Sequence, residues 1–290
     1  MSDPTPQTIS ALVDTARESA EAAARVHRAQ AGRIRVEEAT EKRGADFVTR
    51  VDTEAQEAAL AVIRDRFPEH RILSEEEDGR TGPLSWEARE EESGEEEDSS
   101  DSPGFLWIVD PLDGTTNFLH GHPAYVASVG VVLGIEPLAG AVVASATEER
   151  WWAGRGLGAF RNGRRIRVSE VQELRWSLVG TGFPFKRLEQ LHTYLEELER
   201  VLPATSGIRR GGSAALDLCY LAQGSLDAFW EGRLDPWDVA AGLAILYEAG
   251  GVASRKDGGK LRVPEAGSIL AANAPELMER LRSVVNAPGD

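Results

Sequence analysis

The sequence predicts an α/β fold of layered sheets and helices, with α+β character in its N-terminal part. Strand-like and helical segments alternate through the second half, Val-rich runs in the first half are typical of buried strands, and the N-terminal segments have the apolar periodicity of amphipathic helices. The chain has 290 residues, 41% of them hydrophobic, which is enough for one large domain or two medium ones.

The N-terminal part is expected to begin with two helices. Apolar residues recur at spacings of three and four across residues 8–31, as they do in a helix with one buried face. A second helix is expected to follow Asp52 and to end at Arg66, since Pro68 lies just beyond. A short strand is then expected at residues 71–74.

Apolar runs in the middle of the chain predict further strands. Residues 105–109, FLWIV, are typical of a buried strand. Residues 125–146 are apolar enough to suggest a membrane span, but Glu136-Pro137 interrupts them. We therefore expect two buried strands joined by a turn at that break. Short strands are expected over residues 149–168, with Asn162-Gly163 as a hairpin turn.

The C-terminal part alternates between the two kinds of element, which indicates sheets covered by helices. We find no internal repeat in it. The expected strands are residues 177–181, 226–230, 251–254 and 268–272, and the expected helices are residues 188–201, 213–222, 239–249 and 275–285.

The chain is strongly acidic, with a formal net charge of −16 from 32 basic and 48 acidic residues. Such a charge argues against direct binding of nucleic acid, because nothing offsets repulsion from the phosphates. Residues 87–101 hold nine acids and one Arg, so half of the imbalance lies in a segment whose composition is typical of a solvated loop. The acidity is consistent with adaptation to high salt and equally with a GC-rich genome.

Cysteine content and the N-terminus both favour the cytoplasm. The single Cys219 excludes an intramolecular disulfide, which suits a reducing compartment. The first ten residues lack the basic and apolar regions of a signal peptide. We therefore expect a soluble cytoplasmic protein without a membrane segment.

The segment WIVDPLDGTTNF, residues 107–118, carries the densest chemical signal. Asp110 ends an apolar strand, and the turn that follows can direct Asp110, Asp113 and the Leu112 carbonyl into one space. Hard cations such as Mg²⁺ prefer such oxygen ligands. The N–H groups of Gly114, Thr115 and Thr116 can start a helical turn and face an anion beside the metal.

Three more acids suit the same site. Glu75 follows a short strand, where its carboxylate can point out of the end of a sheet. Asp238 lies in PWD at the start of an apolar helix, and Asp52 lies in DFVTRVD just before another. Taken singly, each has a structural explanation: Asp52 and Asp238 suit helix N-caps, and Glu75 belongs to a solvated run of charges.

Together these segments resemble the inositol monophosphatase family of metal-dependent phosphomonoesterases, and its bacterial members most closely. The resemblance covers about residues 8–275 and implies the layered α/β/α/β/α sugar-phosphatase fold. The similar segments are DFVTRVD (46–52), SEEE (74–77), WIVDPLDGTTNFLHGHP (107–123), GTGFPFK (180–186), RRGGSAALDLCYLAQGSLDAFWEG (209–232) and PWDVAAG (236–242).

The resemblance implies two or three Mg²⁺ ions per site. Glu75, Asp110 and the Leu112 carbonyl would hold the first, and Asp110, Asp113 and Asp238 would hold the second. A third, weaker ion would involve Glu75 through waters. These carboxylates would repel one another without divalent metal between them.

The resemblance also implies how the substrate is handled. The backbone at Gly114 and Thr115 would receive the phosphate, and Asp52, hydrogen-bonded to Thr115, would orient the metal-activated water that attacks phosphorus. The substrate-binding positions implied by the resemblance are Glu75, Leu112, Asp113, Gly114, Thr115, Gly212, Ser213, Ala214, Glu231 and Asp238, of which Gly212, Ser213, Ala214 and Glu231 would line the sugar or polyol hydroxyls.

The implied activity is hydrolysis of inositol 1-phosphate to inositol and phosphate, with inhibition by lithium. Fructose-1,6-bisphosphate, histidinol phosphate and nucleotide 3′-phosphates are alternative substrates within the same chemistry. A protein that binds the transcription machinery is the alternative that is not an enzyme. The complete set of acids favours catalysis.

The implied organisation is an N-terminal α+β part, residues 1–147, that supplies most metal ligands, and a C-terminal α/β part, residues 148–290. A homodimer is expected, since family members commonly form one. The acidic insert at about residues 79–103 is longer than usual in the family, and we expect it to influence metal affinity or the response to salt.

Overall fold

The structure is a computed structural model, and it describes residues 3–41, 47–76, 104–185, 187–263, 265 and 267–287. The acidic insert at 79–103 lies outside the described residues, as do the first residue of DFVTRVD and the last residues of SEEE and GTGFPFK. Every other site residue expected from the sequence is described.

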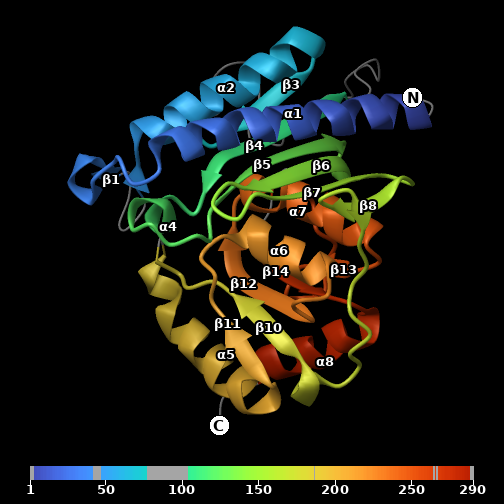
Figure 1. Cartoon of the computed structure of the whole chain (residues 1–290). Coiled ribbons are helices and arrows are strands. Elements are labelled where there is room, and N and C mark those ends of the chain that lie inside the picture. The colour runs from blue at the N-terminus through green and yellow to red at the C-terminus, as the bar shows by residue number, and fades with distance from the viewer. Residues whose placement is uncertain are drawn as a thin grey trace, which may run out of the picture.

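A seven-stranded sheet forms the upper half of the molecule (Figure 1). Its strands follow in chain order, with β3 parallel to β4 and every later neighbour antiparallel. The strands are β3 (Arg71–Ser74), β4 (Phe105–Asp113), β5 (Val126–Leu133), β6 (Glu136–Ala144), β7 (Glu149–Gly154), β8 (Gly158–Arg161) and β9 (Arg164–Arg165).

Two pairs of helices sandwich this sheet. Helices α1 (Pro6–Gln30) and α2 (Arg50–Arg66) cover one face, where Leu12, Leu60 and Trp107 share a core. Helices α6 (Ala214–Ala222) and α7 (Pro236–Glu248) cover the other face, where their apolar residues form a larger core with the sheet. Residues alternate between the two cores along β4 and β5, as expected for strands buried on both sides.

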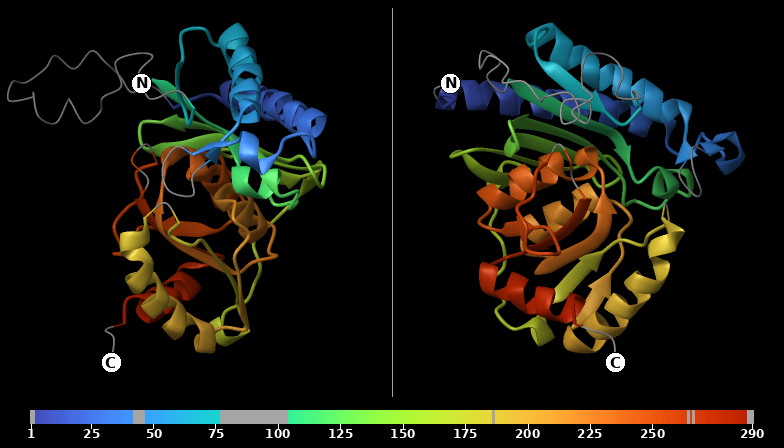
Figure 2. Two further views of the ribbon diagram at one scale, coloured as in Figure 1. Left: turned by 90° about the vertical axis from the view of Figure 1, so that its left-hand side faces the viewer. Right: turned by 180° about the vertical axis from the view of Figure 1, so that it is seen from behind.

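A second sheet of five strands packs beneath α6 and α7 in the order β11-β10-β12-β14-β13 (Figures 1 and 2). Its strands are β10 (Leu178–Thr181), β11 (Gly207–Arg209), β12 (Ala228–Leu234), β13 (Val252–Ser254) and β14 (Gly267–Ala272). Helices α5 (Leu191–Ala204) and α8 (Pro275–Val285) cover its outer face through a third core. The layers are therefore helix, sheet, helix, sheet, helix, which confirms the expected fold class.

Short elements complete the chain. They are β1 (Thr40–Glu41), β2 (Phe47–Val48), α4 (Thr115–Leu119) and three 3₁₀ turns at Val36–Glu38, Leu174–Trp176 and Leu188–Gln190. No helix within the described ranges is both long and apolar enough to cross a bilayer. The division of the chain at residues 147 and 148 stays a proposal; by sheet membership, the strands up to Arg165 join the N-terminal part.

Several boundaries differ from the expected ones for physical reasons. The turn between β5 and β6 lies at residues 134–135, where Gly134 takes a positive φ of 62°, so Glu136 and Pro137 begin β6 instead of forming the turn. Helix α5 begins at Leu191 because residues 188–190 form a 3₁₀ turn first. The three-residue strand β11 carries too short a pattern to be recognised.

Candidate active site

Strand β4 continues four residues beyond the expected end at Val109 and becomes irregular where it reaches the site. Asp110 pairs with Ser128 of β5 and Asp113 pairs with Val126, and the register shifts between those two pairs. The Leu112 N–H donates to Asp110 Oδ1 at 3.0 Å and so turns inward from the ladder. Such an irregularity re-aims side chains at the end of a strand.

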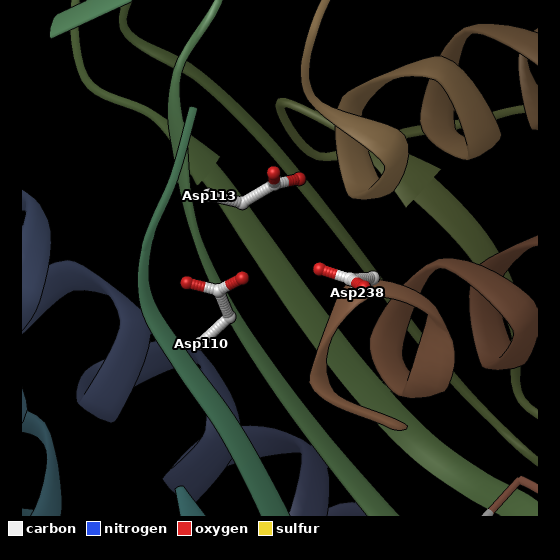
Figure 3. A group of neighbouring side chains, drawn as sticks. All are labelled: Asp110, Asp113 and Asp238. Atoms are coloured by element: carbon white, nitrogen blue, oxygen red, sulfur yellow. The ribbon is translucent and has the colours of Figure 1, made fainter. Parts of the chain in front are cut away.

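The carboxylates of Asp110, Asp113 and Asp238 meet at this point (Figure 3). One oxygen of each lies within 4.8 Å of the others, although two of the residues come from β4 and the third comes from the first turn of α7. Glu75 joins them because β3 runs parallel to β4, and its N–H donates to the Val109 carbonyl at 3.2 Å.

The charges in this cluster oppose one another. Asp110 is 1% exposed. Burial and the negative charges of Glu75, Asp113 and Asp238 all raise the pKa of Asp110 well above its usual value. A cation between these groups would relieve that repulsion.

The donor set fits a hard divalent cation. Every side-chain ligand atom is a carboxylate oxygen, and Leu112 lines the same cavity. Ser128, directly opposite Asp110, is 1% exposed, and its hydroxyl has no hydrogen-bond partner within the described part of the chain. Residues present at the site are therefore suited to Mg²⁺.

Asp113 also joins the two halves of the molecule. Its Oδ2 accepts hydrogen bonds from Ser213 Oγ at 2.7 Å and from the Ala215 N–H at 2.9 Å, both at the start of α6. Asn117 Nδ2 donates to the Ala124 and Gly211 carbonyls at 2.6 Å and 3.0 Å. The turn before α6 is thus fixed to the end of β4 that carries Asp113.

Gly114 makes the sharp turn from β4 into α4, as the DGTT segment predicts. Its φ of +96° belongs to the left-handed region, and an added Cβ would lie 2.8 Å from the Ala124 carbonyl oxygen. Thr115 Oγ1 lies 2.9 Å from Asp52 Oδ1 and 3.1 Å from the Leu112 carbonyl oxygen. The expected hydrogen bond between Asp52 and Thr115 is confirmed.

Asp52 is not an N-cap, contrary to the simplest reading of its position. Helix α2 begins at Arg50, so Thr49 is the N-cap and Asp52 lies in the first turn. The N–H and the hydroxyl of Thr49 both donate to Asp52 Oδ2, at 2.8 Å and 2.7 Å. Burial raises the pKa of Asp52, against the opposing hydrogen bonds from Thr49 and Thr115.

The same correction applies to Asp238. Helix α7 begins at Pro236 with Asp235 as its N-cap, and Asp238 Oδ2 accepts the Asp235 N–H at 2.6 Å. Both helices therefore start with a capping box whose acid sits in the first turn.

One cavity of about 470 Å³ connects the predicted site residues. Asp52 lies behind its wall, in contact with Thr115. The predicted residues that line it are Glu75, Asp110, Leu112, Asp113, Gly114, Thr115, Gly212, Ser213, Ala214, Glu231 and Asp238. Glu231 approaches the backbone of Gly182 so closely that a Cβ there would overlap its carboxylate.

The far wall of the cavity was not expected in detail from the sequence. The guanidinium of Arg210 lies over the rings of Phe183 and Phe185, at 5.2 Å and 5.0 Å from their centroids. The Phe183 ring meets Tyr194 edge to face at 5.5 Å. Phe183 and Phe185 fall within the GTGFPFK segment, but only the fold shows that they face Arg210.

Two buried acids at the cavity were also not predicted from the sequence. Glu197 pairs with Lys256 and accepts the indole N–H of Trp230 at 3.2 Å. Burial and the charge of Asp113 raise the pKa of Asp217 to about 8, against opposing effects from Arg210 and the Gly211 N–H. Both acids line the cavity, and each looks in the sequence like an ordinary polar position on a helix.

Comparisons with known proteins agree with this arrangement. The profile described as "Inositol monophosphatase family" matches residues 7–288. The chain is 39% identical over 243 residues to Nus factor SuhB of Pseudomonas aeruginosa, covering 83% of each protein. It is 40% identical over 244 residues to inositol-1-monophosphatase of Rhizobium meliloti, covering 84% of each.

The fold agrees as well. The crystal structure of the extragenic suppressor protein suhB from Bartonella henselae superposes with a TM-score of 0.81 at 33% identity, covering 96% of this chain and all of that one. Sequence profile, relatives and fold agree, and the chain belongs to the inositol monophosphatase family.

Proposed function

We propose that the protein is a Mg²⁺-dependent phosphomonoesterase that hydrolyses inositol 1-phosphate to inositol and phosphate. The observation that carries the proposal is the convergence of Glu75, Asp110, Asp113 and Asp238 at one end of a cavity. Four acids directed at one another are costly to keep together in a metal-free protein. Their retention is understandable if the charge of Mg²⁺ offsets the repulsion.

The proposed ligands divide between two principal ions. Glu75, Asp110 and the Leu112 carbonyl would hold the first, and Asp110, Asp113 and Asp238 the second, with Glu75 near a third, weaker position. When bound, Mg²⁺ would lower the pKa of a water molecule and neutralise negative charge on the phosphoryl oxygens and the leaving oxygen. Asp113 is well placed for its role because Ser213 and Ala215 fix its carboxylate through Oδ2.

Asp52 and Thr115 would handle the proton of the attacking water. With its own proton directed at Asp52 Oδ1, Thr115 Oγ1 keeps lone pairs to accept a proton from water. Burial raises the pKa of Asp52, which makes its carboxylate a stronger base for that proton. The N–H groups at Gly114 and Thr115 would bind the phosphate beside this pair.

Other residues that line the cavity would bind the alcohol part of the ester. They are Gly212, Ser213, Ala214 and Glu231. Carboxylates accept hydrogen bonds from hydroxyls well, which favours a polyol. Fructose-1,6-bisphosphate, histidinol phosphate and nucleotide 3′-phosphates remain alternative substrates.

The test is phosphate release from these four esters at saturating Mg²⁺, with and without Li⁺. We expect the highest kcat/KM for inositol 1-phosphate and inhibition by Li⁺. Asp65→Asn, on an exposed position of α2, serves as a matched control for substitutions at the site. A higher kcat/KM for another ester would make that ester the substrate, and the proposed Mg²⁺-dependent hydrolysis would still hold.

The second candidate is a binding protein without catalysis, in view of the name Nus factor that the P. aeruginosa relative carries. Release of phosphate from none of the esters would favour it. A cytoplasmic location, a homodimer and the absence of direct nucleic-acid binding stay predictions, to be tested by fractionation, light scattering and filter binding.

A further inference from the structure

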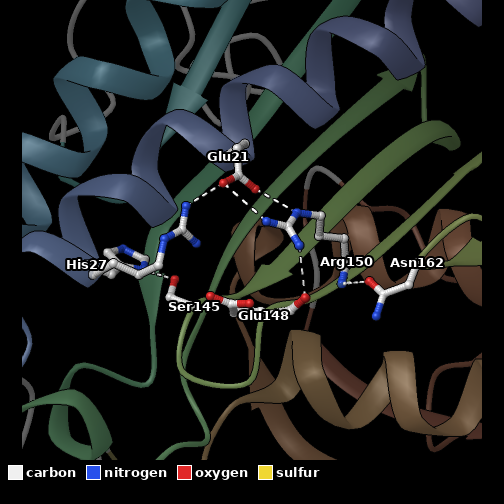
Figure 4. Close-up of polar contacts among 7 residues, drawn as sticks. Glu21, His27, Ser145, Glu148, Arg150 and Asn162 are labelled. Atoms are coloured by element: carbon white, nitrogen blue, oxygen red, sulfur yellow. Dashed lines mark hydrogen bonds and ion pairs between the residues drawn. The ribbon is translucent and has the colours of Figure 1, made fainter.

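A buried histidine lies directly behind the acidic end of β4. His27, in the last turn of α1, is fully buried. Its Nε2 lies 2.8 Å from the Pro111 carbonyl oxygen, and its Nδ1 lies 2.8 Å from Ser145 Oγ, just past the end of β6. Figure 4 shows the ring of His27 beside Ser145.

These two contacts fix the tautomer of the ring. A carbonyl oxygen can only accept, so Nε2 must carry the proton and donate it to Pro111. Nδ1 then bears the lone pair and accepts the proton of the Ser145 hydroxyl. In the neutral ring the one N–H donor is therefore directed at the backbone between Asp110 and Leu112.

This hydrogen bond completes the pairing of the Asp110–Asp113 segment. Where β4 becomes irregular, its backbone groups need partners outside the ladder. The Leu112 N–H is paired with Asp110, and the Leu112 carbonyl is within reach of the Thr115 hydroxyl. The Pro111 carbonyl, between them, is paired with His27.

The ring also supports the turn after this segment. Its centroid lies 6.2 Å from that of Phe118 and 6.0 Å from that of Tyr125. The backbone of Tyr125 packs against Gly114, where an added Cβ would come within 3.3 Å of the Tyr125 Cα. His27 therefore contacts both the end of β4 and the aromatic residues Phe118 and Tyr125, which pack around the proposed phosphate-binding turn.

The helix that carries His27 is itself anchored. Glu21, which precedes His27 on α1, pairs with Arg28 and accepts a hydrogen bond from Arg150 Nε of β7 at 2.9 Å (Figure 4). Arg150 Nη1 donates to the carbonyl of Glu148, which takes a positive φ of 58° in the turn after β6. The donor of His27 thus projects from a helix that is fixed to the sheet.

We propose that His27 is a positioning residue for the proposed metal site: its Nε2–H holds the Pro111 carbonyl so that Asp110, Asp113 and the Leu112 carbonyl keep the geometry that Mg²⁺ requires. The role rests on the proposed function, because it presupposes that these groups bind Mg²⁺. Residues that orient metal ligands commonly change metal affinity by ten- to a hundredfold when replaced.

Three substitutions separate this role from simple packing. In His27→Gln the amide nitrogen can occupy the place of Nε2 and donate to Pro111, whereas in His27→Asn the shorter amide reaches only the place of Nδ1. His27→Leu removes both contacts. The apparent Mg²⁺ dissociation constant, obtained without substrate from the Mg²⁺-dependent rise of Tm, is the main measurement, and Tm without Mg²⁺ reports packing.

We expect His27→Asn and His27→Leu to weaken Mg²⁺ binding about tenfold or more, and His27→Gln to stay within about threefold of wild type. Variants that lower Tm but bind Mg²⁺ as wild type does would reduce His27 to a packing residue and overturn the proposal. A wild-type protein that does not bind Mg²⁺ would instead overturn the proposed function.

A measurement on the wild-type protein covers the case in which the variants do not fold. The ¹⁵N resonances of the His27 ring report which nitrogen carries the proton. The expected result is a proton on Nε2 and a shift of its resonance as Mg²⁺ is added. A proton on Nδ1, or resonances that saturating Mg²⁺ leaves unmoved, would contradict the role.

Discussion

Helices α2 and α7 begin in the same way, but the acids in their first turns, Asp52 and Asp238, have different surroundings at the site. In each, an N-cap residue is followed three positions later by an Asp that accepts the N-cap N–H, as Asp52 does from Thr49 and Asp238 from Asp235. The capping box satisfies N–H groups that would otherwise lack partners at a helix start. The local sequence therefore explains both acids without any function.

The difference lies in what each carboxylate meets next. Asp52 is 1% exposed, and its second oxygen accepts from Thr115, so it is enclosed by hydroxyl and amide donors. Asp238 is half-buried and faces the carboxylates of Asp110 and Asp113. One helix start thus provides an acid surrounded by donors, suited to handling a proton, and the other provides an acid surrounded by acids, suited to a cation.

The largest expected effect is at α7. Asp238→Asn keeps an oxygen that can cap the helix but removes the charge, so we expect phosphate release to fall at least about a thousandfold while the protein stays folded. Asp110→Asn should behave alike. Steady-state kinetics alongside Asp65→Asn measure the effect, and turnover near the wild-type value would break the assignment of Asp238.

The corresponding change at α2 should be smaller and of another kind. Asp52→Asn is expected to lower kcat about a hundredfold, because a group that handles a proton contributes on that order. Half-saturation by Mg²⁺ should move less than about threefold, since Asp52 lies behind the cavity wall. If Asp52→Asn weakened Mg²⁺ binding as strongly as Asp238→Asn, the two helix starts would not have distinct roles.

Lowering the pH should destabilise the protein through His27, which is buried behind β4. Burial lowers the pKa of His27 from 6.5 to about 4, with Arg28 adding to the effect. Between these values the unfolded chain binds a proton that the native protein does not, so stability is fully present above pH 6.5 and is lost as the pH falls to about 4. The loss is at most about 3.5 kcal/mol, at about 1.4 kcal/mol per pKa unit.

Urea unfolding of wild type and His27→Gln at pH 7 and pH 4.5 isolates this contribution. Gln does not titrate, so the variant should lose less stability between the two pH values. Equal losses in both proteins would show that His27 is not the group responsible.

The smallest expected effect concerns the protein without metal. Burial, and then the negative charges of Glu75, Asp113 and Asp238, raise the pKa of Asp110. Asp238→Asn removes one of these charges, so we expect the metal-free Tm to rise by a few degrees, which corresponds to about 1 kcal/mol in the free energy of unfolding. The metal-free Tm of Asp52→Asn should not rise, because the neighbours of Asp52 are hydrogen-bond donors and not acids. Thermal unfolding in EDTA measures both, and a lower metal-free Tm for Asp238→Asn would contradict the repulsion.

Much of the fold was predictable because its signals are local. Apolar periodicity located α1 and α8, and the Asn162-Gly163 turn located the hairpin between β8 and β9. Boundaries at α2 and α7 were less predictable, because capping boxes place the acid inside the helix rather than before it. Strand β11 could not be seen, since three residues carry no periodicity.

The candidate site was predictable where residues of one chemistry cluster in sequence, as in DPLDGTT. What could not be predicted depends on contacts between distant elements. His27 follows the apolar pattern of α1, and nothing local shows that its ring meets Pro111, 84 positions away. Arg210 stacks on Phe183 and Phe185 only because β10 and β11 are neighbours.

Phosphate release from inositol 1-phosphate, measured as a function of Mg²⁺ concentration after removal of metal with EDTA, tests the central claim most directly. We expect no release without Mg²⁺, full recovery on its addition, and no recovery in Asp238→Asn at any concentration. Release that persists in EDTA, or recovery in Asp238→Asn to the wild-type rate, would show that the four acids do not form a catalytic Mg²⁺ site.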